Sequence, residues 1–370
     1  MKKVLMVFGT RPEAIKMCPL VKVLKKKNDI NLYVCISAQH REMLDQVISV
    51  FDIQVDYDLN VMHAGQSLTS VTIEIMNKLE SILDSLQPDL VLVHGDTTTS
   101  FAVALSAFYH KISVGHVEAG LRTYNMYSPY PEEFNRQVVD MITDIYFAPT
   151  QIAKDNLLKE GKPESKIFVT GNTVIDALKT TVKNDFCDEN IDWAKGKRLI
   201  IFTAHRRENL GNPMIEMFSA IKKLSIEYED VRIIFPIHKN PKVRELAYKI
   251  LGDCENIRLI EPLDVLTFHN YMSKCYLILT DSGGIQEEAP SLGKPVLVMR
   301  DITERPEGIK AGTLKLVGVT ENSIYEETKI LLDNKSVYES MSEAKNPYGD
   351  GHASERIANL IVSYLTNKDI

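Results

Sequence analysis

Three carboxylates in one stretch of the sequence have the placement needed for acid–base chemistry. Asp96 and Glu118 each follow a short apolar run, and Glu132 lies where a helix is expected to begin. If the two apolar runs are parallel strands, their carboxyl ends lie at the same edge of a sheet, where open α/β sheets bind ligands. The spacing therefore predicts converging groups that can donate and accept protons, without naming the substrate.

A turn that could bind an anion follows the apolar run at residues 4–8. Gly9 permits a tight turn, Pro12 suits the first turn of a helix, and Arg11 and Lys16 lie about one turn apart. Backbone N–H groups at such a helix start would suit a phosphate. The glycine spacings of a Walker loop and of a dinucleotide fingerprint are both missing from this turn. The alternative is an ordinary strand-to-helix turn, and this motif alone does not decide between them.

A second candidate phosphate site lies between an expected strand and an expected helix. Ser282, Gly283 and Gly284 would present several N–H groups to a diphosphate. Glu288 lies about one turn later, where a carboxylate can accept both hydroxyl groups of a ribose. Because an acidic residue repels a diphosphate, we expect Glu288 to face the sugar. The alternative is a capped helix with solvated acidic residues.

Basic residues follow three further apolar runs in the second half of the chain: His205, Arg206 and Arg207, then His238 and Lys239, then Arg300 and Arg305. Each cluster alone would be typical of a solvated loop, but together they indicate a phosphorylated ligand. His94, His110 and His116 lack the short spacing of zinc ligands. We expect them to be hydrogen-bonded core histidines, and we expect no metal site.

The composition narrows the class of protein. The 370 residues include 43 Lys and Arg against 50 Asp and Glu, a net charge of −7, which argues against a sequence-independent nucleic-acid binder. The five cysteines are scattered through apolar runs and predict reduced core thiols in a cytoplasmic protein: Cys18, Cys35, Cys187, Cys254 and Cys275. The first apolar run is too short for a signal peptide, and none reaches the roughly 18 residues of a membrane span.

Short apolar runs alternate with helical patterns along the chain, which indicates parallel α/β sheets. Strands are expected at residues 4–8, 32–37, 90–94, 113–117, 145–148 and 167–170, and again at 198–202, 231–235, 257–260, 276–279, 296–299 and 314–317. Helical spacing is clear at residues 67–86 and 354–364, whereas residues 185–197 are polar and lack sustained periodicity. The simplest interpretation is two doubly wound domains joined near residues 171–197, with a last helix that could pack on either.

In their order, these motifs resemble the non-hydrolysing UDP-N-acetylglucosamine 2-epimerases. The similarity covers nearly the whole chain, at residues 8–14, 38–44, 94–99, 116–122, 281–292, 303–306 and 346–351. It implies a GT-B fold, with two Rossmann-like domains and the active site in the cleft between them. The N-terminal domain, residues 1–172, would carry the carboxylates, and the C-terminal domain, residues 173–352, would bind UDP. Residues 353–370 would form a helix that returns to the first domain.

The resemblance also implies an activity and a mechanism. These enzymes interconvert UDP-GlcNAc and UDP-ManNAc without an added cofactor, typically as homodimers, and supply ManNAc-type sugars for surface polysaccharide. They eliminate UDP to form 2-acetamidoglucal and add it back after C2 is protonated on the other face. Because C2–H is not next to a carbonyl, its removal needs a good leaving group at C1, and cations and helix N-termini would stabilise the departing UDP.

Residue roles follow from the same resemblance. The catalytic positions are Asp96, Glu118, Glu132, Arg136 and His205. The positions that bind substrate and UDP are Arg11, Lys16, Arg206, Phe268, Ser282, Gly283, Gly284, Glu288 and Arg305. We hypothesise that two of the carboxylates exchange the C2 proton on opposite faces and that their repulsion tunes their pKa values. The sequence does not assign an acid to a face.

A regulatory site is implied as well, because some bacterial members bind a second UDP-GlcNAc as an activator. The positions used there match Gln39, Glu132, Arg206 and His238. Glu42 and Gly65 stand where such members can carry Gln and Arg. Since a cation is lost and an acid gained near a diphosphate, we expect activation to be present but weaker.

Three alternatives to this interpretation remain. A hydrolysing epimerase would release UDP and free ManNAc. A GT-B glycosyltransferase would need an acceptor groove and would leave the three carboxylates without a joint task. A nucleotide-sugar-binding protein without catalysis would gain nothing from acids near a diphosphate.

Overall fold

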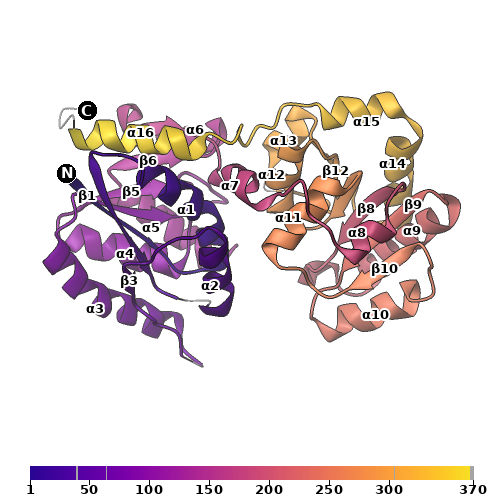
Figure 1. Cartoon of the computed structure of the whole chain (residues 1–370), viewed down its shortest axis with the longest axis horizontal. Coiled ribbons are helices and arrows are strands. Elements are labelled where there is room, and N and C mark those ends of the chain that lie inside the picture. Colours follow the sequence, from indigo (N-terminus) through magenta and orange to yellow (C-terminus); the bar gives the residue numbers. More distant parts are fainter. Residues whose placement is uncertain (39–40, 64, 304, 367–370) are drawn as a thin grey trace. The chain divides into compact units, whose positions relative to one another are not determined.

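The computed structural model describes residues 1–38, 41–63, 65–303 and 305–366 and divides into two compact units (Figure 1). The first unit comprises Met1–Lys179 and Tyr348–Ile370, and the second comprises Thr180–Pro347. The chain therefore passes from the first unit to the second and returns. The limits expected from the family resemblance were residues 172 and 352.

A seven-stranded sheet organises the first unit, and every pairing among its described residues is parallel. In the order in which they pair, its strands are β3 (Tyr57–Asp58), β2 (Ile30–Ile36), β1 (Lys2–Phe8), β4 (Leu90–His94), β5 (Ser113–Val117), β6 (Ile145–Ala148) and β7 (Ile167–Val169). The chain proceeds outward from β1 on one side and from β4 on the other. The topological switch point therefore lies at their carboxyl ends, beside Gly9 and Gly95, where sheets of this kind bind ligands.

A six-stranded sheet organises the second unit, again with parallel pairing throughout the described strands. Its strands are, in order of pairing, β10 (Ile257–Ile260), β9 (Val231–Pro236), β8 (Arg198–Thr203), β11 (Leu277–Thr280), β12 (Val296–Val298) and β13 (Leu314–Leu316). The switch point here lies between β8 and β11, so residues 204–206 and 281–284 flank it.

Helices connect the strands in both units. Those of the first unit are α1 (Arg11–Leu24), α2 (Arg41–Val50), α3 (Leu68–Leu86), α4 (Thr98–Tyr109), α5 (Glu132–Ile142), α6 (Gln151–Lys159), η1 (Glu164–Lys166), α7 (Thr173–Thr181), which reaches the unit boundary, and α16 (Ala353–Thr366). Those of the second unit are α8 (Glu189–Trp193), η2 (Arg207–Asn209), α9 (Asn212–Glu227), α10 (Pro241–Leu251), α11 (Val265–Lys274), α12 (Ile285–Glu288), η3 (Ala289–Leu292), α13 (Pro306–Ala311), α14 (Glu321–Asp333) and α15 (Lys335–Ser342).

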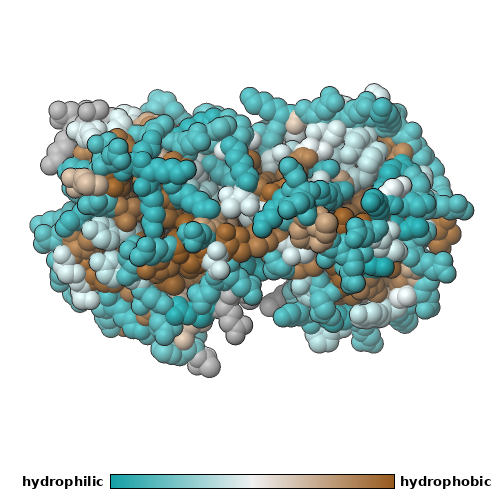
Figure 2. Space-filling view, in the orientation of Figure 1, coloured by the Kyte–Doolittle hydropathy of each residue, from teal (hydrophilic) through white to brown (hydrophobic). Residues whose placement is uncertain are grey.

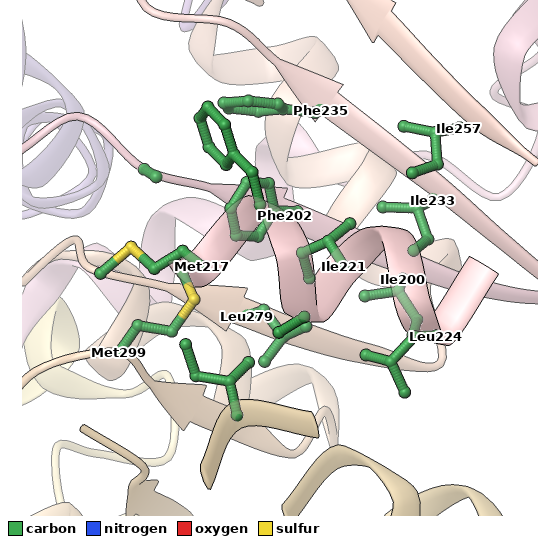
Figure 3. Close-up of a cluster of buried hydrophobic side chains, with 14 of the residues drawn as sticks. Ile200, Phe202, Met217, Ile221, Leu224, Ile233, Phe235, Ile257, Leu279 and Met299 are labelled. Carbon is green, nitrogen blue, oxygen red and sulfur yellow. The ribbon is translucent and has the colours of Figure 1, made fainter. Parts of the chain in front are cut away.

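Each sheet is buried between helices, as the continuous apolar runs of its central strands require. Figure 3 shows one face of the second sheet, where Met217, Ile221 and Leu224 of α9 meet side chains of β8, β9, β10 and β11. At the centre, the rings of Phe202 and Phe235 meet edge to face with their centroids 4.6 Å apart. This packing holds the carboxyl ends of β8 and β9 in fixed positions.

The last helix, α16, packs on the first unit, where Figure 1 shows it along α1. Its inward face buries Ile357, Ile361 and Leu365. Asp176 of α7 caps its start by accepting the backbone N–H groups of Ala353 and Ser354, at 3.2 and 2.8 Å. The apolar pattern alone left the partner of this helix open, whereas the family resemblance implied the first domain, and α16 packs on the first unit.

The parallel α/β architecture is confirmed, and the expected limits of β4, β5, β6 and β10 are those observed. The elements that were not expected include the short strand β3 and α8, which interrupts the polar stretch at residues 185–197. The expectation of five core thiols is wrong for Cys187, which is exposed, and for Cys254, which is half-buried. The other three thiols are buried. A cysteine within an apolar run is therefore shielded from solvent only where that run belongs to the core.

The surface seen in Figure 2 is largely hydrophilic over the outer helices, with apolar patches between them. In the described part of the chain, no helix combines the length and the apolarity that crossing a bilayer requires.

Candidate active site

The turn between β1 and α1 is closed by the protein's own carboxylate. Thr10 caps α1, and Glu13 completes a capping box by accepting the N–H groups of Gly9 and Thr10 at 3.0 and 2.7 Å. These two N–H groups are therefore occupied, which corrects the expectation that they would bind an external anion. Arg11 begins the helix and is half-buried.

Glu13 also joins this turn to the neighbouring one. Its other oxygen accepts the hydroxyl groups of Thr97 and Ser100, at 2.7 and 3.1 Å, at the start of α4. The side chain is almost fully buried. Gly9 is needed beside it, because a Cβ atom there would lie 1.8 Å from Oγ of Ser37. One buried carboxylate thus fixes both turns at the switch point.

Asp96 lies in the second of these turns and is held at two places. Its carboxylate pairs with the Arg136 guanidinium of α5, and its carbonyl accepts a hydrogen bond of 2.8 Å from the side chain of Asn135. The residue before it, Gly95, has a φ of +62°, which glycine adopts without strain. About a quarter of the Asp96 side chain remains exposed, so a ligand can reach it.

Glu118 follows β5 and lies next to the turn that carries Asp96. Its φ is +67°, a left-handed conformation that is unusual for a glutamate and that clusters at functional sites. The carboxylate pairs with the Lys16 ammonium and accepts a hydrogen bond of 3.0 Å from Asn172. Its other oxygen lies 3.9 Å from a Cβ atom built on Gly95. Glu118 and the turn that carries Asp96 are therefore neighbours.

The charge state of Glu118 follows from these contacts. Burial alone would raise its pKa, but the Lys16 ammonium and the His94 imidazole outweigh that effect and hold the pKa of Glu118 well below its usual range. The nearest His94 nitrogen, Nε2, lies 3.6 Å from the carboxylate. Glu118 is therefore an ionised carboxylate at neutral pH.

Glu132 begins α5, next to a second glutamate with a different task. One oxygen of Glu132, Oε2, is buried and has no hydrogen-bond partner among the described residues. Glu133 instead accepts the backbone N–H groups of Thr123 and Tyr124, at 3.0 and 2.9 Å, and pairs with Arg136. Glu133 thus ties the loop after β5 to α5, while the Glu132 carboxylate keeps an unused acceptor.

The three histidines considered as metal ligands have different surroundings. His116 is buried with both ring nitrogens bonded, as expected, whereas Nε2 of His94 has no hydrogen-bond partner among the described residues. His110 is half-buried at the end of α4, outside the core. The expectation of three bonded core histidines is therefore wrong for His94 and His110. In the described chain, no group of three or more metal-binding side chains is placed to hold an ion.

In the second unit, Asp281 organises the switch point. Its Oδ2 atom accepts the N–H groups of His205 and Arg206, both at 2.9 Å, and Nδ1 of His205 lies 3.0 Å from Oδ1. Arg206 also donates its Nε–H to the Asp281 carbonyl at 2.9 Å. Burial raises the pKa of this carboxyl, but His205 and the two N–H groups outweigh that effect and lower it. These hydrogen bonds join the segments that follow β8 and β11. The His205 side chain remains about 41% exposed to solvent.

The Ser282–Gly284 turn lies beside them. Ser282 donates its N–H to Oγ1 of Thr280 at 2.9 Å, so this group, expected to be available to a ligand, is used internally. The helix that follows, α12, has only four residues. The carboxylate of Glu288 lies back over the turn, 3.7 Å from a Cβ atom built on Gly284, and its other oxygen is 3.5 Å from the buried His269.

The remaining sequence-predicted positions are distributed around this switch point. Arg305 pairs with Glu287 of α12 at 2.6 Å. His238 follows β9 and stacks on His205 with the ring centroids 5.9 Å apart. Phe268 of α11 is half-buried against the apolar cluster that contains Tyr271. Gln39 lies outside the described residues.

Within the first unit, the structure brings together the proposed catalytic and UDP-binding residues Lys16, Asp96, Glu118 and Arg136. Within the second, it brings together His205, Arg206 and His238. The side chains that hold these groups were not predicted from the sequence: Glu13, Glu133, Asn135, Asp140, Asn172 and Asp281. Only Glu13 had a recognisable signal, the Thr10-x-x-Glu13 spacing of a capping box. The others act through contacts distant in sequence.

Comparison with known proteins decides the family. The family model described as UDP-N-acetylglucosamine 2-epimerase matches residues 22–362. The chain belongs to the UDP-N-acetylglucosamine 2-epimerase family. Its activity is that of the family, the C2 epimerisation of UDP-N-acetylglucosamine, which makes this epimerase an isomerase.

Individual relatives of known family are similar to this chain over nearly its full length. The epimerase is 58% identical to the UDP-N-acetylglucosamine 2-epimerase of Bacillus subtilis over 368 residues, which cover 99% of this chain and 97% of the relative. A crystal structure of a putative UDP-N-acetylglucosamine 2-epimerase from Listeria monocytogenes is 53% identical, with a TM-score of 0.96 and coverage of 100% and 98%. The enzyme of Neisseria meningitidis bound to UDP-GlcNAc is 50% identical, with a TM-score of 0.87 and coverage of 98% and 100%.

A more distant similarity concerns the fold alone. A glycosyltransferase from Rickettsia africae is 12% identical, with a TM-score of 0.63 over 100% of this chain and 99% of that one. Together with the two parallel sheets, this likeness shows that the epimerase has a GT-B-like two-domain α/β fold.

Proposed function

We propose that this epimerase interconverts UDP-GlcNAc and UDP-ManNAc by eliminating UDP and adding it back, and that it supplies ManNAc-type sugars for surface polysaccharide. The observation that carries the proposal is the pairing of two carboxylates with cations at one switch point. Glu118 is paired with Lys16, and Asp96 with Arg136. Both acids are held in place by these cations, and about a quarter of the Asp96 side chain is exposed, as proton exchange with a bound sugar requires of at least one of them.

In the proposed reaction, elimination of UDP begins at C2 of the sugar. A carboxylate removes the proton from C2, the C2–H electrons form the C1=C2 double bond, and the C1–O bond breaks so that UDP leaves with its electron pair. The product, 2-acetamidoglucal, is flat at C2. Protonation of C2 on the opposite face, with return of the UDP oxygen to C1, gives the epimer. Because Glu118 is ionised, it can act as the base, and Asp96 and Glu132 can supply the second acid–base group.

The second unit would stabilise the leaving group. His205, Arg206 and the Ser282–Gly284 turn flank its switch point, and cations placed where charge develops lower the barrier to departure of a diphosphate. We assign Glu288 to the ribose hydroxyl groups, and Arg11, Lys16, Phe268 and Arg305 to the remaining substrate contacts. Relatives support a UDP ligand, since the Neisseria meningitidis enzyme was solved with UDP-GlcNAc and a Staphylococcus aureus protein, MnaA, with UDP.

This assignment makes a geometric demand. For one sugar to contact the carboxylates while its diphosphate contacts the cations, Asp96, Glu118 and Glu132 must face Arg11, His205 and Ser282 across one cleft. Residues 1–172 would then supply acid–base groups and residues 173–352 the UDP site. A structure of the epimerase with UDP bound tests this demand directly. UDP bound away from the His205–Ser282 switch point would contradict it.

A second UDP-GlcNAc would activate the enzyme weakly. Of the positions proposed for that molecule, Arg206 already donates to the Asp281 carbonyl and lies 3.2 Å from Glu208. Gly65 has a φ of +79° with open space around it, and so offers no side chain to a diphosphate. Initial rates should therefore rise almost hyperbolically with substrate. Strongly sigmoidal kinetics at low micromolar substrate would contradict weak activation.

A second copy of the chain would cover an apolar surface on the first unit. The neighbouring helices α3, α4 and α5 expose large apolar side chains: Leu68, Ile73, Phe108, Tyr109, Phe134 and Met141. Exposed apolar surface of this kind marks interaction sites, which supports a homodimer. Light scattering should give twice the mass of the chain, and Ile73→Glu with Met141→Glu should halve it. A monomeric wild-type protein would contradict the assignment.

Proton exchange at C2 tests the mechanism. In D2O, both nucleotide sugars should gain deuterium at C2 while little free UDP appears. UDP that accumulates in step with turnover would show a hydrolysing enzyme instead. No exchange, or exchange that survives the double change Asp96→Asn with Glu118→Gln, would overturn the proposal.

A further inference from the structure

A buried charged network, not used in the chemistry above, lies beneath the catalytic segments of the first unit. It comprises His116 of β5, Arg122 in the following loop, Asp140 of α5 and Glu160 after α6. The side chains of His116, Arg122 and Asp140 have no exposed area. Burying charge is costly, so such a network needs a reason.

The hydrogen bonds of His116 show that its ring is a cation. Nδ1 lies 2.6 Å from Oδ1 of Asp140, and Nε2 lies 2.8 Å from the carbonyl oxygen of Gly95. A carbonyl oxygen can only accept. Asp140 is also an acceptor, since its Oδ2 atom receives Gly120 N–H at 3.1 Å and lies 2.8 Å from the Arg122 guanidinium. Both nitrogens of His116 must therefore donate, and only the imidazolium does so.

The charges of the network agree with this state. With His116 protonated, two cations face two carboxylates and the four side chains together carry no net charge, the Glu160 carboxylate lying at the exposed end of the network. Burial raises the pKa of Asp140, but His116 and Arg122 outweigh that effect and hold it below its usual value. Asp140 is therefore the carboxylate that the hydrogen bonds require.

Asp140 reaches all three segments that carry the carboxylates. Through His116 it holds the Gly95 carbonyl, which immediately precedes Asp96. Through Gly120 N–H it holds the turn that starts at Glu118. Glu132 and Asp140 are eight residues apart on α5, with Arg136 midway, and this spacing places them along one helix face.

We infer that Asp140 and protonated His116 are positioning residues that hold the Asp96 turn, the Glu118 turn and the Glu132 helix in register. Neither is a catalytic residue, because neither is assigned a contact with the substrate. The inference rests on the proposed function, in which Asp96, Glu118 and Glu132 exchange the proton at C2. A shift of about 1 Å in such a group can cost roughly 100-fold in rate, so a rigid connection among the three is of direct use.

The variant His116→Gln tests the inference, because glutamine is uncharged and cannot donate to Asp140 and to Gly95 in the same geometry. We expect kcat to fall about 10- to 100-fold, with KM and UDP affinity within about threefold of wild type, since UDP is bound elsewhere. His110→Gln, at the end of α4, is the matched control and should change neither constant. A kcat within threefold of wild type, or an equal loss of UDP affinity, would overturn the positioning role.

A second measurement needs no variant and no turnover. Neutron crystallography of the deuterium-exchanged wild-type protein should show deuterium on both ring nitrogens of His116, because both face acceptors. Deuterium on only one nitrogen would overturn the inference. The proposed function fails separately, if Asp96→Asn with Glu118→Gln leaves exchange at C2 intact. Loss of exchange in that variant with full activity of His116→Gln would reject only the positioning role.

Discussion

At the scale of single residues, the proposed role of Glu118 as a base predicts that its pairing with Lys16 sets the acidic limit of activity. The ammonium helps to hold the pKa of Glu118 well below its usual range, so the Glu118 carboxylate stays ionised as the pH falls. Lys16→Met removes that charge and raises the pKa of Glu118. The acidic fall of kcat/KM should therefore begin at higher pH in the variant, and a pH profile measures it. Lys16→Arg should keep the wild-type limit, and an unmoved limit in Lys16→Met would contradict the role.

Asp281 makes a different single-residue prediction in the second unit. Asp281→Ala removes the acceptor of the His205 and Arg206 N–H groups and of the buried Asn209 side-chain amide, which should cost about 2–4 kcal/mol in the free energy of unfolding. Asp281→Asn keeps an acceptor oxygen and should cost about half as much. Urea unfolding of the two variants gives the difference. Equal losses would mean that the carboxylate charge, not the hydrogen bonds, stabilises the turn.

At the scale of elements, the start of α1 depends on one glutamate. Glu13→Ala removes the acceptor for Gly9 and Thr10 N–H and for the hydroxyl groups of Thr97 and Ser100. We expect a loss of about 2–4 kcal/mol in the free energy of unfolding of the first unit, from thermal or urea unfolding. Glu80→Ala on the exposed face of α3 is the control and should change it by less than about 0.5 kcal/mol. A neutral Glu13→Ala would contradict the account of the turn.

Elements with a strong local signal were the predictable part of this molecule. The apolar runs at residues 90–94 and 113–117 became β4 and β5 because a strand buried on both faces needs continuous apolar side chains. Two-residue β3 has no such run and depends on pairing with β2. Asp96, Glu118 and Glu132 could be proposed from strand ends, whereas Asp140 and Asn172 could not. Asp140 contacts His116, 24 residues away in sequence, and Asn172 contacts Glu118, 54 residues away. Only the folded chain brings these partners close.

At the scale of the whole molecule, the chain crosses between the units twice, and its last helix completes the unit in which it began. Local sequence explains the helix, since Ile357 and Ile361 recur at helical spacing, but not its destination. That is set by the cap from Asp176 and by packing on α1. We therefore expect the stability of the first unit, which carries Asp96, Glu118 and Glu132, to depend on α16.

Ile361→Ala measures this dependence. The side chain is fully buried in α16, so its truncation should cost about 2–4 kcal/mol and lower the unfolding transition of the first unit. Saturating UDP, which the proposed function assigns to the second unit, should still bind the folded variant with wild-type affinity. Asn359→Ala, on the exposed face of the same helix, is the matched control and should leave the transition in place. If Ile361→Ala lowers only the transition of the second unit, α16 does not stabilise the unit on which it packs.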